Sequence, residues 1–269
     1  MNELYASFPD NVEYKNNLAI SYSKLGETHA SLGNLEKALG FFEIFNQFMH
    51  ELYESFPDNV GFKNGLAISY EKLGQTHASL GNLEKAFSLF EIQTKLFEEL
   101  HTSFRDNVEY KNNLAISYSK LGDIYQKTGR ADEALFFCKQ YSGLFKELYE
   151  ASSDNVSFVI NYIKSLNAVG LYLLQQENEE GFTYFEEAER LTNLHKNLSE
   201  DLIEVQEMIA LNKMTMGLHI GQNGDEEKGL TMLKESLATF QQLFNKTKKN
   251  QYQLIIRQFE ALFNEEEGE

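Results

Sequence analysis

The sequence predicts an all-α fold, an α-solenoid of about five antiparallel helix pairs followed by a C-terminal capping helix. The first observation is an internal repeat. The string YKNNLAISYSKLG at residues 14–26 returns unchanged at 110–122, and returns with changes at 62–74 and 158–170. Successive copies begin 48 residues apart, a fixed period typical of solenoids, whose units bury apolar faces against their neighbours. The second observation is composition, because only two prolines occur and apolar residues recur at helical spacing.

The first helix of each unit is expected to begin at an aspartate. Asp accepts hydrogen bonds from the free N–H groups of a first helical turn, so it is a favourable N-cap. The aspartates at this place in the repeat are Asp10, Asp58, Asp106 and Asp154. Glu13 follows Asp10, and Glu109 follows Asp106, at the spacing of a capping box.

Each unit then continues with an apolar stripe, a glycine turn and a second helix. The stripe of the first helix comprises Leu18, Tyr22, Leu25 and His29. Turns are predicted at Gly33, Gly81 and Gly129, because glycine commonly ends a helix. The second helix is expected to bury Leu35, Ala38, Phe42, Phe45, Met49 and Leu52.

This order of residues resembles the tetratricopeptide repeat. The family's sequence of Leu-Gly, aromatic, Gly, apolar, Ala and aromatic is matched by Leu25-Gly26, His29, Gly33, Leu35, Ala38 and Phe42. The third copy matches it with Leu121-Gly122, Tyr125, Gly129, Ala131, Ala134 and Cys138. The resemblance implies a right-handed superhelix. A family unit has about 34 residues, so the longer unit here is expected to extend each helix by about two turns.

The repeat also sets the expected boundaries. Residues 1–9 match the end of a second helix, so they are interpreted as the tail of a truncated preceding helix, with a half-helix cap as the alternative. The array is expected over residues 10–248, with units at 10–57, 58–105, 106–153, 154–200 and 201–248. Residues 249–264 are the predicted capping helix, with an apolar stripe, and residues 265–269 an acidic tail.

Charge and cysteine usage narrow the function classes. Lys and Arg number 24 against 41 Asp and Glu, a net charge of −17 that repels phosphate backbones and anionic lipid, so neither nucleic acid nor membrane is an expected partner. Cys138 is the only cysteine, so no intramolecular disulfide is expected, and its helical spacing indicates a packed, inert thiol. No signal peptide and no apolar run of about 20 residues are visible, so we expect a cytoplasmic protein.

The resemblance implies that the first helices line a groove that binds peptides. The residues carried over to it are Asn16, Ile20, Ser23, Glu27, Asn64, Ile68, Glu71, Gln75, Asn112, Ile116, Ser119 and Asp123. Asn amides pair with peptide backbone, Ile gives an apolar floor, and carboxylates favour Lys or Arg, so a basic partner is expected. The alternative is a solvated helix face copied by recent duplication.

Two further comparisons concern this face. A subclass of the family clamps chaperone C-terminal carboxylates with Lys three residues before the motif Gly and Asn just after it. Those places here hold Ser23 and Glu27, Glu71 and Gln75, and Ser119 and Asp123, so repulsion argues against that role. In the last two units the face becomes apolar, at Leu171, Leu174, Leu211, Met214 and Leu218. This patch is expected to be covered by the C-terminal helix; the alternative is a hydrophobic pocket.

No catalytic, metal or cofactor site is predicted. His29 and His77 occupy matching packing positions, and the other histidines form no ligand spacing. No Gly-x-x-x-x-Gly-Lys-Ser/Thr sequence occurs. The leading hypothesis is therefore a non-enzymatic scaffold or adaptor that binds a peptide or partner protein. Two alternatives stay open: a sensory or regulatory repeat segment of a larger effector, and self-association through exposed repeat ends.

Overall fold

The computed structural model describes residues 11–195 and 203–266, with side chains up to residue 261. The described residues form eleven helices and no strand. They divide into two compact units, Met1–Leu144 and Phe145–Glu269, which we describe separately. The predicted tail at residues 1–9, Asp10, the unit boundary at 200/201 and residues 267–269 of the predicted acidic tail lie outside the described residues.

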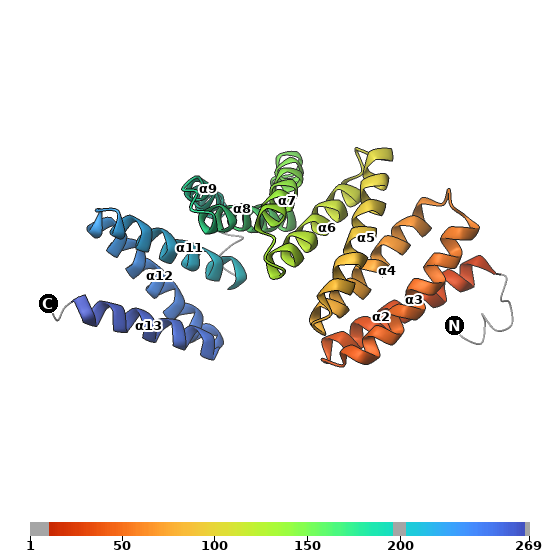
Figure 1. Ribbon diagram of the computed structural model, residues 1–269, viewed down its shortest axis with the longest axis horizontal. Helices are drawn as coiled ribbons and strands as arrows, with labels where there is room; N and C mark the ends of the chain where they lie inside the picture. Colours follow the sequence, from red (N-terminus) through yellow and green to blue (C-terminus); the bar gives the residue numbers. More distant parts are fainter. Residues whose placement is uncertain (1–10, 196–202, 267–269) are drawn as a thin grey trace. The chain divides into compact units, whose positions relative to one another are not determined.

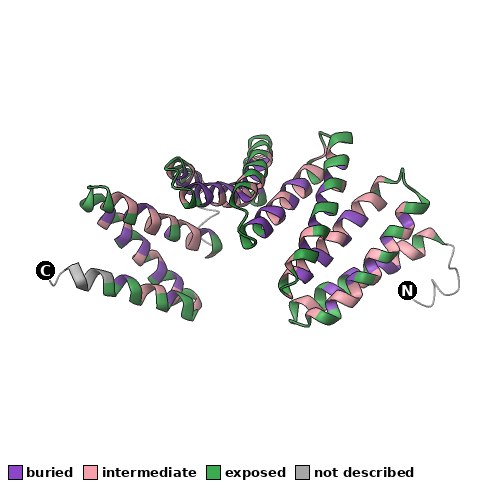
Figure 2. Cartoon of the chain, viewed as in Figure 1, coloured by how far each residue is buried: buried purple, intermediate pink, exposed green. Residues whose placement is uncertain are grey.

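The first unit is a run of antiparallel helices in which each helix packs on the next (Figure 1). These helices are α2 (Val12–Ser31), α3 (Leu35–Ser55), α4 (Val60–Ser79), α5 (Leu83–Ser103), α6 (Val108–Lys127) and the first part of α7 (Ala131–Ala151). The sides that face neighbouring helices are buried, and the turns are exposed (Figure 2). Fold class is thus confirmed as all-helical, with successive helix pairs.

The N-caps differ from the prediction by one residue. Asn59 has an extended backbone, with φ −79° and ψ 104°, and its side chain accepts a hydrogen bond from the backbone N–H of Phe62. The equivalent caps are Asn11, Asn107 and Asn155. The predicted caps at Asp58, Asp106 and Asp154 are therefore wrong, because the chain turns into the helix only at the next residue, whose amide oxygen offers the same acceptor.

Glycines at two kinds of position shape each helix pair. Gly33, Gly81 and Gly129 have φ of 76°, 80° and 76°, the left-handed conformation predicted for the turns. Inside the helices, a Cβ on Gly74 would lie 2.6 Å from the ring of Phe90, which is buried in α5. Absence of a side chain at Gly74 therefore allows α4 and α5 to pack closely.

The predicted apolar stripe is buried only in part on α2. Leu18 is buried, but Leu25 is 45% exposed, whereas its counterparts Leu73 and Leu121 are 7% and 3% exposed. The difference arises because a preceding helix packs on the first helix of the later copies: α3 covers Leu73 of α4, and α5 packs on α6. No described helix precedes α2.

The second unit contains the rest of α7 with α8 (Val156–Gln175), α9 (Gly181–Leu194), α11 (Ile203–Gln222), α12 (Glu226–Thr247) and α13 (Asn250–Glu266). Two pairs of glycines face each other here, and added Cβ atoms would meet main chain. A Cβ on Gly170 would lie 2.8 Å from the carbonyl oxygen of Gly181, and one on Gly217 would lie 2.9 Å from that of Gly229. These helices approach each other backbone to backbone.

Helix α8 is more apolar than the sequence analysis allowed. It is the one helix within the described ranges long and apolar enough to cross a membrane by those two criteria. However, 56% of the apolar window is buried, and the helix packs on α9 and α11. It therefore has the contacts of a core helix.

Helix α13 packs on α12 and reaches α11. Tyr252 is fully buried, and its hydroxyl lies 2.9 Å from Oε2 of Glu207. Phe259 is also buried, in a cluster with Phe240 and Leu243 of α12. The apolar stripe predicted for this helix is thus used for packing within the second unit.

Candidate functional site

The face predicted to bind peptides lies along α2, α4 and α6 of the first unit. Ile20, Glu27 and Asp123 are exposed on it, whereas Ser23 is buried. The remaining predicted residues are half-buried: Asn16, Asn64, Ile68, Glu71, Gln75, Asn112, Ile116 and Ser119. Most of these side chains are therefore partly covered by neighbouring residues and partly accessible on the face.

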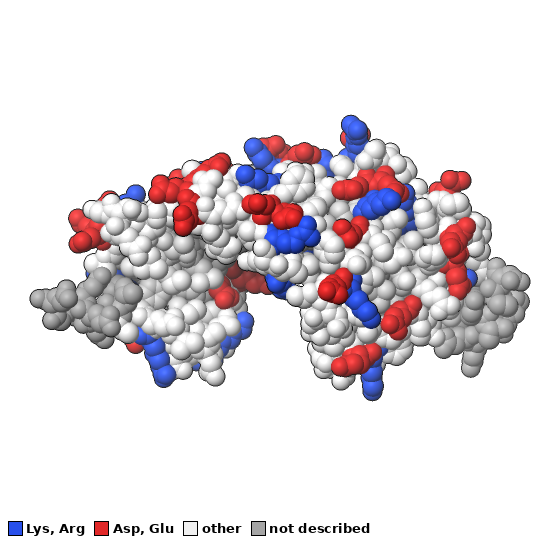
Figure 3. Space-filling view, viewed as in Figure 1, with Lys and Arg blue, Asp and Glu red and all other residues white. Residues whose placement is uncertain are grey.

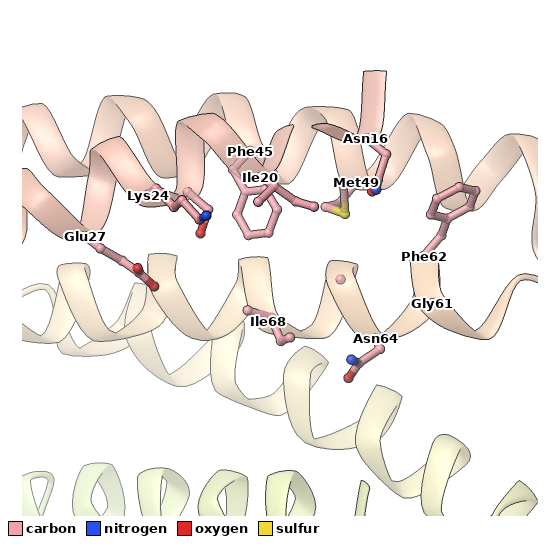
Figure 4. A pocket seen from close by; sticks show the side chains of 12 residues that line it. Asn16, Ile20, Lys24, Glu27, Phe45, Met49, Gly61, Phe62, Asn64 and Ile68 are labelled. Atoms are coloured by element: carbon pink, nitrogen blue, oxygen red, sulfur yellow. The ribbon is translucent and has the colours of Figure 1, made fainter. Parts of the chain in front are cut away.

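Half of the predicted residues meet in one pocket of about 410 Å³ formed by α2, α3 and α4. Its predicted members are Asn16, Ile20, Ser23, Glu27, Asn64 and Ile68. Figure 4 shows Ile20, Phe45 and Met49 on one side and Ile68 of α4 on the other. This size and this mixture of apolar floor and few polar groups are typical of ligand sites. We call it the α2–α4 pocket.

Half of the residues that line the pocket were not among the predicted binding residues. Phe45 and Met49 come from a second helix, where they were assigned only to the core, and Lys24, Gly61, Phe62 and Gly65 were not singled out. A Cβ on Gly65 would lie 2.5 Å from Sδ of Met49, so this glycine lets the methionine approach α4. The available signal was that Gly61, Phe62 and Gly65 each differ from the residue at the same place in the neighbouring copies.

The corresponding place between α4 and α6 is built differently. There the Nδ2 of Asn64 donates a hydrogen bond to Oε1 of Glu109 at 3.3 Å. Gln93, which occupies the place of Phe45, is fully buried, and neither of its side-chain polar atoms has a hydrogen-bond partner. The near-identical copies therefore do not create equivalent sites.

The predicted acidic residues differ in their electrostatic state. Glu27 pairs with Lys72 of α4 at 2.7 Å. Burial raises the pKa of Glu71, an effect that Lys72 and Lys120 partly offset, and Gln75 donates a hydrogen bond to its Oε1 at 2.8 Å. Desolvation also raises the pKa of Asp123, although this residue is exposed and solvent screens it.

The helices that carry these acidic residues also carry lysines. Lys24, Lys72 and Lys120 share one place in the repeat, two residues before the motif glycine. On the face seen in Figure 3, acidic and basic side chains are interspersed over the first unit. The side of the first unit drawn there therefore carries both signs of charge, despite the net charge of −17.

Comparisons with known proteins agree with this architecture. Residues 115–146 match the family model described as "Tetratricopeptide repeat". BtubC (BKLC) from P. vanneervenii is similar in structure with a TM-score of 0.64 at 16% identity, over 88% of this chain and 84% of that chain. The chain has a tetratricopeptide-repeat fold. No curated protein sequence matches it.

Two further structures share the tetratricopeptide-repeat fold with this chain. A Podosopora anserina protein described as having nearly identical TPR-like repeats gives a TM-score of 0.59 at 15% identity, over 87% of this chain and 98% of that chain. The apo form of RapI gives 0.59 at 11% identity, over 98% of this chain and 89% of that chain. At these identities the likeness establishes the fold alone.

The apolar patch predicted on the last two repeats is largely open. Leu171, Leu211 and Leu218 are 43%, 39% and 38% exposed, so the expectation that the C-terminal helix covers them is wrong. Helix α13 packs instead on α12, where Met214 joins its cluster, and Leu174 lies beside Gly181 of α9. The apolar stripe of α13 has its partners there and leaves Leu171, Leu211 and Leu218 exposed.

His29, His77 and Cys138 have packing roles. The ring of His29 stacks on Phe41, and burial lowers the pKa of His77. Cys138 is buried, where its sulfur would lie 3.0 Å from a Cβ on Gly122. Among the described residues, no group of three or more His, Cys, Asp or Glu side chains could hold a metal ion.

Proposed function

We propose that this protein is a non-enzymatic interaction module that binds an extended segment of a partner protein along α2, α4 and α6. The observation that supports this most is the α2–α4 pocket, because six residues predicted to bind from their place in the repeat line one cavity. Tetratricopeptide-repeat folds commonly present such surfaces to peptides, which is consistent with the proposal.

The chemistry of the face suits a peptide main chain. Asn16, Asn64 and Asn112 stand one repeat apart, and an amide side chain both donates to a carbonyl and accepts from an N–H group. Ile20, Ile68 and Ile116 follow at the same interval and give apolar contacts between the amides. A peptide segment that lies across α2, α4 and α6 would contact one such Asn and one such Ile on each helix.

Charge suggests a basic group in the segment beyond the pocket. Glu71 and Asp123 carry no ion pair among the described residues, whereas Glu27 is neutralised by Lys72. Burial destabilises the charged form of Glu71, and a Lys or Arg of the partner would stabilise it again.

The test uses a random library of 12-residue peptides displayed on phage and selected on the wild-type protein. Affinities of the selected peptides are then measured by fluorescence polarisation for E71K/D123K and for the control E43K/E91K. Glu43 and Glu91 are exposed on second helices, one repeat apart, so the control makes the same change in net charge away from the face.

We expect E71K/D123K to weaken binding about tenfold, as two like-charge contacts replace two attractive ones, and the control to bind as wild type does. Circular dichroism should show equal helicity in all three proteins. Equal affinities for both variants would remove this face from the proposal.

A further inference from the structure

The near-identical copies of the repeat provide an internal reference for the α2–α4 pocket. Between residues 61 and 74, the second copy departs from both the first and the third at four positions: Gly61, Phe62, Gly65 and Glu71. Three of these four positions line the pocket. Most of the departures within this stretch therefore lie at one cavity.

Two of the departures remove side chains. In the third copy the place of Gly61 is taken by Glu109, whose carboxylate accepts from Asn64 and occupies the gap between α4 and α6. In the gap between α2 and α4, Gly61 leaves Asn16 without that neighbour. Gly65 stands where the other copies have Asn17 and Asn113, and its lack of a side chain leaves room for Met49.

The third departure makes the wall apolar. Phe62 replaces a tyrosine and so contributes a ring without a hydroxyl group. The floor also lacks a polar group, because Phe45 stands where the next gap has Gln93. The rings of Phe45 and Phe62 line the pocket together with Ile20, Met49 and Ile68. An apolar side chain of a ligand would be buried against them.

One end of the pocket carries a cation. Lys24 lines it, and no carboxylate pairs with Lys24 among the described residues, whereas its counterpart Lys72 is paired with Glu27. A free Glu27 would repel a bound carboxylate. Its pairing with Lys72 removes most of that repulsion and leaves Lys24 as the charge that a ligand would meet.

We infer that the α2–α4 pocket selects a peptide in which one large aliphatic or aromatic residue stands beside Asp or Glu. The apolar side chain packs against Met49 in the space beside Gly61, and the carboxylate meets the ammonium group of Lys24. Asn16, which has no counterpart of Glu109 as a neighbour, binds the main chain beside it. The inference rests on the proposed peptide binding and assigns to this pocket the position that determines specificity.

The decisive variant restores the residues of the other copies. Peptides selected from the 12-residue phage library on wild type are measured by fluorescence polarisation against G61E/G65N. This variant is expected to fold, because the first and third copies carry Glu at the place of Gly61 and Asn at the place of Gly65. The matched control E13G/N17G exchanges the same residues in the first copy, at positions outside the pocket lining.

We expect the selected peptides to share one large apolar residue next to Asp or Glu. G61E/G65N should weaken them about tenfold or more, as a filled pocket rejects a side chain, while E13G/N17G changes affinity by less than about twofold. If G61E/G65N loses helicity, Ile20→Asn serves as a second variant and should also weaken the selected peptides. It is expected to fold, because Ile20 is 41% exposed and contributes little to the core.

A charge exchange tests Lys24. K24E should weaken the acidic peptide about fivefold at low salt, and replacing the peptide's Asp or Glu by Lys should restore binding to K24E. Absence of any enriched peptide overturns both this inference and the proposed function. Peptides that lose affinity for E71K/D123K but bind G61E/G65N as tightly as wild type overturn the pocket alone.

Discussion

Single asparagines fix where the first helices begin. The sequence offers Asp and Asn side by side before α2, α4, α6 and α8, and both have the acceptor oxygen that a cap requires. The structure places the extended residue at Asn59 and its equivalents, so the amide oxygen satisfies the N–H group of the third helical residue. Sequence reasoning identified the cap chemistry correctly and misplaced it by one residue, because the two neighbours differ only in backbone conformation.

Replacing one of these caps should therefore cost stability. Asn59→Ala removes the acceptor for the N–H of Phe62 and is expected to destabilise the protein by about 1 kcal/mol. Asn34→Ala is the matched control, since Asn34 stands at the N-cap of α3 but its side chain makes no capping hydrogen bond. The midpoints of urea unfolding, followed by circular dichroism, should fall for the first variant only. Equal midpoints would mean that the cap at Asn59 contributes nothing.

At the scale of helices, the close contact of α4 with α5 depends on one glycine. An added methyl group on Gly74 would overlap the ring of Phe90, which has little space to move because it is buried. Gly40 of α3 is also inside a helix, but nothing lies within 4 Å of an added Cβ there.

The two glycines should accordingly respond in opposite directions to the same change. Gly74→Ala is expected to lower the free energy of unfolding by about 1 to 3 kcal/mol through overpacking. Gly40→Ala is expected to raise it by about 0.5 to 1 kcal/mol, because alanine has the higher helix propensity. Thermal melting of both variants against wild type checks this. A stabilised Gly74→Ala protein would contradict the packing described here.

Helix positions and the core faces could be predicted because the apolar spacing and the repeat are written in the sequence. The twelve groove residues were located by their place in the repeat, and six of them do meet in one pocket. The contribution of Phe45 and Met49 could not be predicted, because a core residue becomes part of a pocket only where its neighbour on another helix is small. That depends on Gly65, which lies in a different repeat.

At the scale of the whole chain, the second unit depends on α13 to complete its core. Tyr252 and Phe259 fill space beside Phe240 and Leu243, and Tyr252 reaches Glu207 of α11. The amphipathic pattern predicted this helix but suggested the wrong surface, since Leu171, Leu211 and Leu218 stay exposed. Periodicity shows which side of a helix is apolar; it carries no information on which of several apolar surfaces that side contacts.

Removal of α13 should therefore expose a core rather than free a surface. A chain that ends at Lys248 is expected to melt at lower temperature and to bind the dye ANS, because Phe240 and Leu243 lose their cover. Leu254→Ser serves as the control, as Leu254 lies on the same helix and is 61% exposed. Unchanged melting after truncation would show that α13 is dispensable for the second unit.

The facing glycines of the second unit limit how its sequence can change. A clash at Gly74 can be relieved by a smaller residue in place of Phe90, since the obstacle there is a side chain. At Gly217 the obstacle is the carbonyl oxygen of Gly229, an atom that every amino acid carries. A smaller residue at another position cannot remove that oxygen, so a side chain at Gly217 requires α11 and α12 to move apart.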